Sequence, residues 1–358
     1  GPYNRTLTIA DNELAFMGDS AMAAWGDTST NLIQNGTVGV KYPMGPDGRG
    51  GEQPRGTKVL RNVVHEIGLW QKQSSLWFQA VAAQTQLQDN IFYNGPRAAF
   101  NFNVRPARVE REISWSCAWP RDQKFTLRVS LQDGFGGGDD ISGNLLLNTC
   151  RESSDHGPWN SVPLQPFGRQ ISPLSIASLA GWDRVPYITE LRHGPGKPSI
   201  IPADRHIHHN LIIATYNSQE PIDTDDGSAY IQVHDNFLAY GDNGLKSDFG
   251  GHDEPYYRNI LAYVGSCWNM FSFYGYNDGF WNNTCVFRTG YNSDCFGKGK
   301  GLGWKVHDNK VFSSSGDENV CGTKLSTWLA QGHDAGTTIA KWPASDTLIA
   351  WGKALLGM

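Results

Sequence analysis

Acidic side chains occur in adjacent pairs, or next to a histidine, at several points in the middle of the chain. Asp155 precedes His156, Asp225 precedes Asp226, and Asp248 follows further along. Crowding raises the pKa of one carboxyl group, so that it stays protonated while a second stays ionised as a base or nucleophile. Hydrolysis of a glycosidic bond requires such a pair. We therefore expect Asp225, Asp226 and Asp248 to serve as acid and base in a glycoside hydrolase, with Asp155 and His156 as their partners.

Polar and aromatic residues near these carboxylates are candidates for substrate binding. The set comprises Asp223, Lys246, His252, Asp253 and Trp159. The face of a tryptophan ring can stack on the C–H surface of a sugar. The same stretches allow a second chemistry, that of a polysaccharide lyase, in which the acidic cluster holds Ca²⁺ and Lys246 or His156 removes the proton α to a uronate carboxylate. Calcium is the cofactor that this second interpretation requires, and the sequence predicts no other metal.

Each acidic residue also has a purely structural explanation. Asp and Gly are common in turns, where an Asp side chain caps its own backbone. For a single Asp this explanation is the better one, whereas for Asp155, Asp225, Asp226 and Asp248 together the structural and the functional explanation are equally credible. A third interpretation therefore stays open, in which the chain is a non-catalytic extracellular protein that binds carbohydrate or self-assembles through its strand edges.

An asparagine that recurs before short apolar stretches predicts the elements that carry these residues. Most consecutive instances are 23 to 28 residues apart. The instances are Asn12, Asn35, Asn62, Asn90, Asn144, Asn210, Asn236, Asn259, Asn283 and Asn309. The residue two positions later is apolar in every instance except Thr37, which is typical of an inward strand position. This period predicts a single right-handed parallel β-helix whose asparagines stack at one corner and tolerate the left-handed backbone there.

Counting from each asparagine predicts which side chains share a flank of this β-helix. Asp155 lies 11 residues after Asn144, Asp223 lies 13 residues after Asn210, and Lys246 and Asp248 lie 10 and 12 residues after Asn236, so they share one flank. Stacked strands are about 4.8 Å apart, so carboxylates on adjacent coils are expected about 5 Å apart. Such separations include those used by retaining and inverting glycosidases.

Two gaps interrupt the asparagine period. The first, from Asn90 to Asn144, fits one coil with an insertion at residues 103–132. The second, from Asn144 to Asn210, fits two coils with an insertion at residues 162–181, although one of those coils lacks an asparagine. We expect residues 1–321 to form the β-helix and residues 322–358 to form a capping segment, with a short helix at 345–356 over the open end.

Several short motifs resemble the right-handed parallel β-helix proteins of the pectin-lyase-like superfamily. They are HEIGLW at 65–70, KQSS at 72–75, NGPRA at 94–98, GFGGG at 134–138, CRESSDHGP at 150–158 and DTDDG at 223–227. The resemblance implies binding or cleavage of polysaccharides, and the subgroup with these motifs has no assigned reaction. In that subgroup both insertion sites are continuous, so this chain departs from the pattern there.

The composition limits the partners and the compartment. Lys and Arg total 30 against 35 Asp and Glu, which gives a net charge of −5 and argues against a nucleic-acid partner. No apolar run is long enough to span a membrane. With the resemblance above, we expect a secreted protein whose partner is a polysaccharide or glycan.

The six cysteines allow three disulfides. Cys295 and Cys321 each lie 12 residues after a corner asparagine, Asn283 and Asn309, which predicts that they stack on neighbouring coils and bond. The remaining pairs would be Cys117 with Cys150 and Cys267 with Cys285. Disulfides of this kind are expected in an oxidising compartment.

Overall fold

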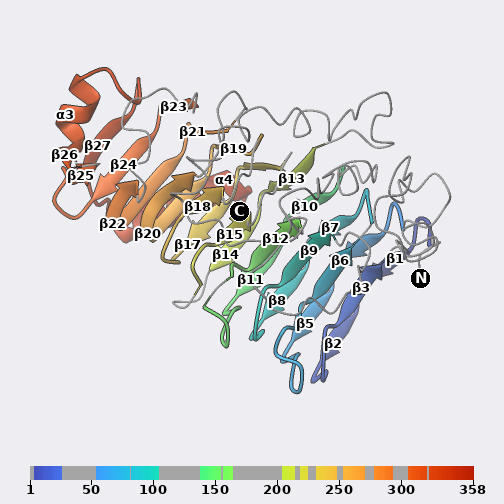
Figure 1. The fold of residues 1–358 in the computed structure, drawn as a ribbon. Helices are drawn as coiled ribbons and strands as arrows, with labels where there is room; N and C mark the ends of the chain where they lie inside the picture. The colour runs from blue at the N-terminus through green and yellow to red at the C-terminus, as the bar shows by residue number, and fades with distance from the viewer. Residues whose placement is uncertain are drawn as a thin grey trace, which may run out of the picture.

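The computed structural model describes residues 4–25, 54–80, 82–104, 138–154, 156–163, 204–213, 218–224, 231–247, 253–270, 278–292, 305–320 and 322–358. Within these ranges the chain winds into a parallel β-helix, in which the strands of successive coils stack along the molecule (Figure 1). The predicted all-β solenoid is therefore confirmed.

Each coil contributes strands to three faces. The first face is a nine-stranded parallel sheet of β1 (Thr8–Ala10), β4 (Lys58–Leu60), β7 (Gln86–Gln88), β10 (Asp140–Ser142), β13 (Arg205–His208), β16 (Ile231–His234), β19 (Pro255–Tyr257), β21 (Gly279–Trp281) and β23 (Lys305–His307). The second face consists of β2 (Glu13–Ala15), β5 (Val63–His65), β8 (Ile91–Tyr93), β11 (Leu145–Leu147), β14 (Leu211–Ile213), β17 (Phe237–Ala239), the first part of β20 (Ile260–Met270), β22 (Thr284–Asn292), β24 (Lys310–Ser313) and β27 (Thr338–Lys341).

The third face consists of β3 (Met22–Trp25), β6 (Trp77–Ala80), β9 (Phe100–Val104), β12 (Trp159–Pro163), β15 (Ile222–Thr224), β18 (Leu245–Ser247) and the last part of β20. The long strand β20 pairs with β17 through residues 260–262 and with β18 through residues 268–270. It thereby joins the second and third faces into one 16-stranded sheet.

The core lies inside the coils and consists of the middle residues of these short strands. On the first face Leu87, Ile141, Ile207 and Val233 follow one another in register, and none is more than 1% exposed. A three-residue strand with period 2 has one inward and two outward positions. Burial of an apolar row on each face therefore contributes to holding the coils together.

The predicted asparagine ladder is present along the corner between the first and second faces. Asn210 donates from its backbone N and its Nδ2 to Oδ1 of Asn236, at 3.1 and 2.9 Å. The same stacking runs through Asn12, Asn62, Asn90, Asn144, Asn210, Asn236, Asn259, Asn283 and Asn309. The left-handed backbone belongs to the residue before each asparagine, for example Asp235 with φ 55°, and not to the asparagine as expected. The role of the asparagine is therefore the hydrogen bonding of its side-chain amide to the neighbouring coils and not a left-handed backbone.

Two predictions of the coil count are wrong. Asn12 donates directly to Asn62 and β1 pairs with β4, so no coil begins at Asn35, which itself lies outside the described residues. Asn144 donates directly to Asn210 and β10 pairs with β13, so one coil and not two separates them. In both cases the extra residues come, in the sequence, between the third strand of one coil and the first strand of the next, which are β3 and β4 in the first case and β12 and β13 in the second.

The boundaries of the predicted insertions also change. Asn103 belongs to β9 and Val162 belongs to β12, and both strands pair in register with each other. The undescribed residues 105–137 and 164–203 follow these strands. Both insertions therefore begin slightly later than the sequence indicated.

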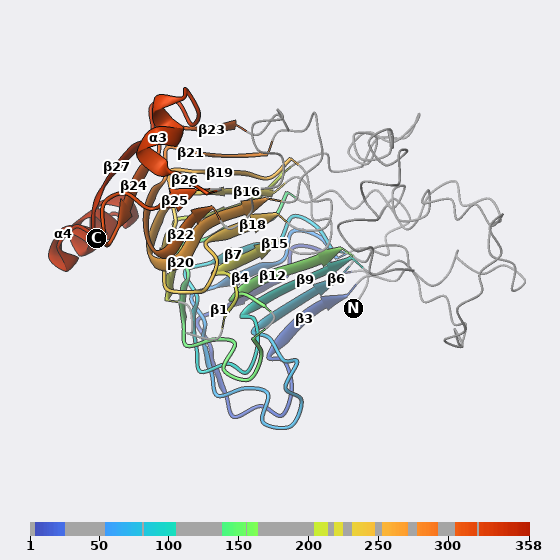
Figure 2. The ribbon, with the colours of Figure 1, turned by 60° about the vertical axis from the view of Figure 1, so that its left-hand side comes forward.

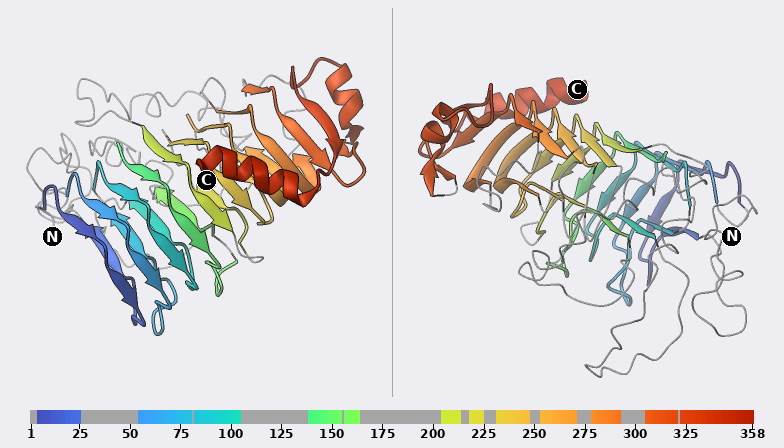
Figure 3. Two further views of the ribbon diagram at one scale, coloured as in Figure 1. Left: turned by 180° about the vertical axis from the view of Figure 1, so that it is seen from behind. Right: turned by 45° about the horizontal axis from the view of Figure 1, so that its top comes forward.

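The C-terminal segment extends the second face and covers part of it. Strands β25 (Asn319–Val320) and β26 (Thr323–Lys324) form a hairpin, and helix α3 (Leu325–Ala330) follows it at the end of the solenoid (Figure 2). Helix α4 (Ser345–Leu356) has the predicted bounds, but it lies on the outer surface of the second face (Figure 3). Its Leu348 packs with Ala239, Ala262 and Val286, which lie on β17, β20 and β22. The outer apolar residues of that face explain why α4 does not cover the open end.

A disulfide between Cys267 and Cys285 joins the neighbouring strands β20 and β22. This is one of the three pairs expected from the sequence. Cys150 is a free, buried thiol, so the pairing of Cys117 with Cys150 is wrong. Burial raises the pKa of the Cys150 thiol to about 12. The predicted pair Cys295 and Cys321 lies outside the described residues.

Replacing both Cys267 and Cys285 with alanine is expected to lower the free energy of unfolding by about 3 kcal/mol, because the bond closes a loop of intermediate length in the unfolded chain. Urea unfolding of the variant and of the oxidised protein measures the difference. Peptide mapping without reductant is the control, and recovery of free Cys267 and Cys285 from the folded protein would contradict the bond.

Candidate functional site

The outward-pointing side of the third face carries a row of polar residues, one on each of five consecutive strands, and the first four of these residues are at most 7% exposed. The row is Asn101, Asn160, Asp223, Lys246 and Asn269, which pair in register from β9 to β20. Their neighbours in the same strands, including Trp159, Ile222 and Leu245, point into the core. Figure 2 shows several of these strands side by side. Because period 2 puts the row on the outer side, its polar character is not required by the core.

Lys246 lies between two carboxylates at the centre of this row. Its Nζ is 3.2 Å from Oδ1 of Asp223 on the adjacent strand and 3.7 Å from Oε2 of Glu220, which precedes that strand. Glu220 also accepts a hydrogen bond from Nδ2 of Asn243 at 2.8 Å. The ammonium therefore lies between the carboxylates, in the position that a cation shared by both would take.

A histidine and an arginine continue the row of charges on the other side of Asp223. Oδ2 of Asp223 accepts from Nδ2 of Asn160 at 3.0 Å and lies 3.9 Å from Nδ1 of His156. Nη2 of Arg97 donates to Nε2 of the same histidine. Since Nε2 accepts, the proton of a neutral His156 lies on Nδ1, facing Asp223. From Asp223 onward the charges alternate, with Lys246 between Asp223 and Glu220, and His156 lies between Arg97 and Asp223.

Exposure distinguishes the carboxylates of this network from its nitrogen-bearing side chains. The side chains of Asp223 and Glu220 are 1% and 0% exposed, whereas Lys246 and His156 are 8% and 15% exposed. A charge is buried at a high free-energy cost unless it is paired, and each of these is paired. Lys246, His156 and the partly buried Arg97 are therefore nearer to solvent than the two carboxylates.

A buried hydrogen-bond network inside the coil supports the same two strands. The hydroxyl of Tyr256 donates to the backbone carbonyl of Lys246 at 2.6 Å, and Thr224 donates to the same carbonyl. Oε2 of Glu254 lies 3.1 Å from Oγ1 of Thr224. Burial raises the pKa of Tyr256 well above its usual range, with a further contribution from the charge of Glu254. The phenol therefore stays protonated and holds the backbone beneath the site.

The structure brings together three of the residues predicted from the sequence: His156, Asp223 and Lys246. Trp159 lies in the hydrophobic core at 1% exposure, so its ring is not at the surface. Asp253 precedes β19, in the next coil, and has a left-handed backbone with φ 54°. The remaining predicted residues, Asp155, Asp225, Asp226, Asp248 and His252, lie outside the described residues.

Three members of the network were not predicted from the sequence: Arg97, Asn160 and Glu220. Arg97 lies within the NGPRA motif, which was noted only for its resemblance. Asn160 is recognisable only from the strand register, because it pairs directly with Asp223. Glu220 lies in a corner outside the strands, where no periodicity predicts its position.

No protein family model, curated protein or solved structure matches the chain. The structure supports the parallel β-helix architecture, and none of these comparisons supports the expected membership of the pectin-lyase-like superfamily. Among the described residues, no three His, Cys, Asp or Glu side chains form a group that could hold a metal ion. In the same part of the chain, no helix has the length and hydrophobicity needed to cross a membrane.

Proposed function

We propose that the protein is an extracellular enzyme that cleaves an acidic polysaccharide along the outer surface of its third face. The observation that carries this proposal is the row of polar and charged residues centred on Lys246, in which Lys246 and His156 are nearer to solvent than Asp223 and Glu220. Coils repeat about every 4.8 Å, so successive sugars of an extended chain would meet side chains of successive coils. The Cys267–Cys285 bond supports the extracellular assignment, because disulfides persist in oxidising compartments.

The arrangement of charges favours cleavage by β-elimination. In this reaction a base removes the proton α to the uronate carboxylate, and that electron pair forms a carbon–carbon double bond. The bond from the β carbon to the glycosidic oxygen breaks, and the departing oxygen takes up a proton to leave as a hydroxyl group. Negative charge develops on the carboxylate, and fixed cations in a water-poor site stabilise it strongly. Lys246 supplies that charge, with the Arg97–His156 pair beside it, while Asp223 and Glu220 hold the ammonium in place. Calcium held by the predicted carboxylates remains part of this proposal.

Hydrolysis is the second candidate, because two carboxylates flank the same ammonium. Asp223 and Glu220 differ in their partners, since Asp223 has Asn160 and His156 and Glu220 has Asn243. Different surroundings separate the pKa values of two carboxyl groups, as an acid and a base require. Asp225, Asp226 and Asp248 remain the proposed acid and base of this mechanism, with Asp155 as a partner.

A screen of neutral and uronic polysaccharides tests the proposal. We expect a uronic polysaccharide to yield the ultraviolet absorbance of unsaturated uronates together with new reducing ends. New reducing ends without that absorbance would contradict elimination and show that the reaction is hydrolysis. Retention of a polysaccharide without either product would contradict both reactions and favour a carbohydrate-binding or self-assembling protein.

A further inference from the structure

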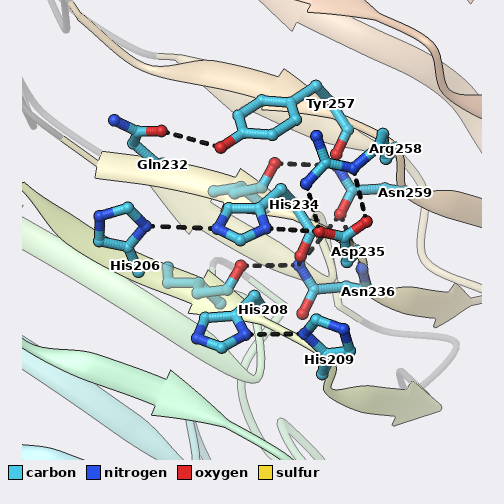
Figure 4. Close-up of polar contacts among 12 residues, drawn as sticks. His206, His208, His209, Gln232, His234, Asp235, Asn236, Tyr257, Arg258 and Asn259 are labelled. Carbon is cyan, nitrogen blue, oxygen red and sulfur yellow. Dashed lines mark hydrogen bonds and ion pairs between the residues drawn. The ribbon is translucent and has the colours of Figure 1, made fainter. Parts of the chain in front are cut away.

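Four histidines gather on the outer surface of the first face, on two neighbouring coils (Figure 4). His206 and His208 belong to β13, His209 follows it, and His234 belongs to β16. The pairing of β13 with β16 puts His208 directly beside His234. None of these histidines belongs to the charged row on the third face.

The imidazoles contact one another directly. Nδ1 of His206 is 3.3 Å from Nε2 of His234, and Nδ1 of His208 is 2.8 Å from Nδ1 of His209. The rings of His208 and His234 stack with centroids 5.0 Å apart and an interplanar angle of 1°. Two imidazole–imidazole hydrogen bonds and one stack therefore involve the same four rings.

Charged and polar groups from every neighbouring strand surround these rings. Asp140 of β10 lies 3.4 Å from Nε2 of His208. Asp235 lies 2.7 Å from Nδ1 of His234 and also accepts two bonds from Arg258, which follows β19. Tyr257 of β19 stacks on His234 at 4.9 Å and donates to Gln232 of β16. Gln232 in turn donates to Asp204, which precedes β13.

While the rings are neutral, these contacts fix the position of the proton on His234. Its Nδ1 donates to Asp235, which leaves Nε2 as the lone pair that accepts from Nδ1–H of His206. A proton added at Nε2 of His234 still finds a lone pair if His206 carries its own proton on Nε2. Once both rings are protonated, two N–H groups face each other 3.3 Å apart with no acceptor between them. The bond between His208 and His209 has the same limit, since two imidazolium rings share no lone pair.

We propose that this histidine cluster is an acid-sensitive junction between the coil of β13 and the coil of β16, closed while its imidazoles are neutral and opened when they are protonated. Opening breaks the imidazole bonds and adds positive charge to rings that are stacked. The backbone bond from the His209 N to the Asp235 carbonyl, at 3.0 Å, joins the same two coils beside the cluster. The junction is thus a local element with two states, set by pH.

Electrostatics at His234 agree with this geometry. Burial lowers the pKa of His234 from 6.5, the neighbouring His208 and His206 lower it further, and Asp235 partly offsets the effect. A histidine with a lowered folded-state pKa binds its proton first in the open or unfolded chain. The stability of the junction is therefore complete above pH 6.5 and is lost as the pH falls below that value.

The junction also affects the ion pair of Asp223 and Lys246 on the third face. This consequence rests on the proposed function. The coil of β13 continues through β14 to β15, which carries Asp223, and the coil of β16 continues through β17 to β18, which carries Lys246. Opening the junction loosens the stacking of the two coils whose contact forms the ion pair. Protonation of the histidines on the first face would then reduce polysaccharide cleavage at the third face.

Hydrogen exchange of the full chain between pH 7.5 and pH 5 tests the junction independently of any activity. After correction for the intrinsic pH dependence of exchange, we expect the amides of His209 and of β13 and β16 to exchange about tenfold faster at the lower pH. His234→Gln should remove most of this acceleration, since it leaves no imidazole to protonate at the centre. Equal acceleration in His234→Gln and in the unchanged protein would overturn the proposal.

His307 provides a matched control within the same row of stacked rings. It stacks on Trp281, and its Nδ1 lies 2.8 Å from Asp308, as His234 does with Asp235, but its ring neighbour is an indole and not an imidazole. His307→Gln should therefore keep the full acceleration at β13 and β16. If His234→Gln does not fold, His206→Gln gives the same test, because it removes the donor to His234 Nε2. Loss of the acceleration only in His307→Gln would contradict the assignment.

Discussion

Replacing Asn236 with alanine is expected to lower the free energy of unfolding by roughly 3–5 kcal/mol. Its Oδ1 accepts from the backbone N and Nδ2 of Asn210. Its Nδ2 donates to the carbonyls of Ile207 and His234 at 2.8 and 3.0 Å, and to Oδ1 of Asn259. Alanine leaves these groups without partners inside the corner, where each buried unsatisfied group costs about 1–3 kcal/mol.

Urea unfolding measures this loss, and the exposed end of the same ladder supplies the control. Asn12 makes the same kind of bonds to Asn62, but its side chain is exposed, so water replaces what alanine removes. Asn12→Ala should therefore be much less destabilising than Asn236→Ala. Equal losses at the two positions would show that burial does not determine the strength of the ladder.

The ladder illustrates what this sequence encodes most clearly. An asparagine every 23 to 28 residues followed by an apolar position predicts the coils, because each coil repeats the same corner and the same inward residue. The count of coils failed at Asn35 and between Asn144 and Asn210. An insertion and an additional coil have similar lengths, and only strand pairing distinguishes them.

The site was predictable only where it belongs to the strands. The offsets from the corner asparagines predicted that Asp223 and Lys246 lie on the same flank. In the structure these two residues pair in register. Arg97 and Glu220 come from corners whose lengths vary between coils, so no offset applies to them. Trp159 was expected at the surface, but it alternates with Asn160 in β12 and therefore points inward.

The last prediction concerns the ion pair at the centre of the proposed site. Lys246→Met should reduce polysaccharide cleavage at least about 100-fold, because it removes the positive charge that stabilises the developing negative charge. Initial rates on the polysaccharide identified by the screen measure the loss, with near-ultraviolet circular dichroism as the test of folding. Lys246→Arg keeps a charge between the carboxylates, and its wider guanidinium should lower kcat more than it raises KM.

A matched ion pair outside the row separates the effect of position from the effect of charge. Lys72 lies 2.9 Å from Glu152, and both side chains are about half exposed, so Lys72→Met should leave cleavage and stability within experimental error. Asp223→Asn combined with Lys246→Met completes a double-mutant cycle. If Asp223 acts only by holding Lys246, its replacement removes nothing further once the lysine is gone. The double variant should therefore cleave the polysaccharide little more slowly than Lys246→Met alone. Fully additive losses would mean that Asp223 does not act by holding the lysine, and Asp223 would then have an independent role in cleavage.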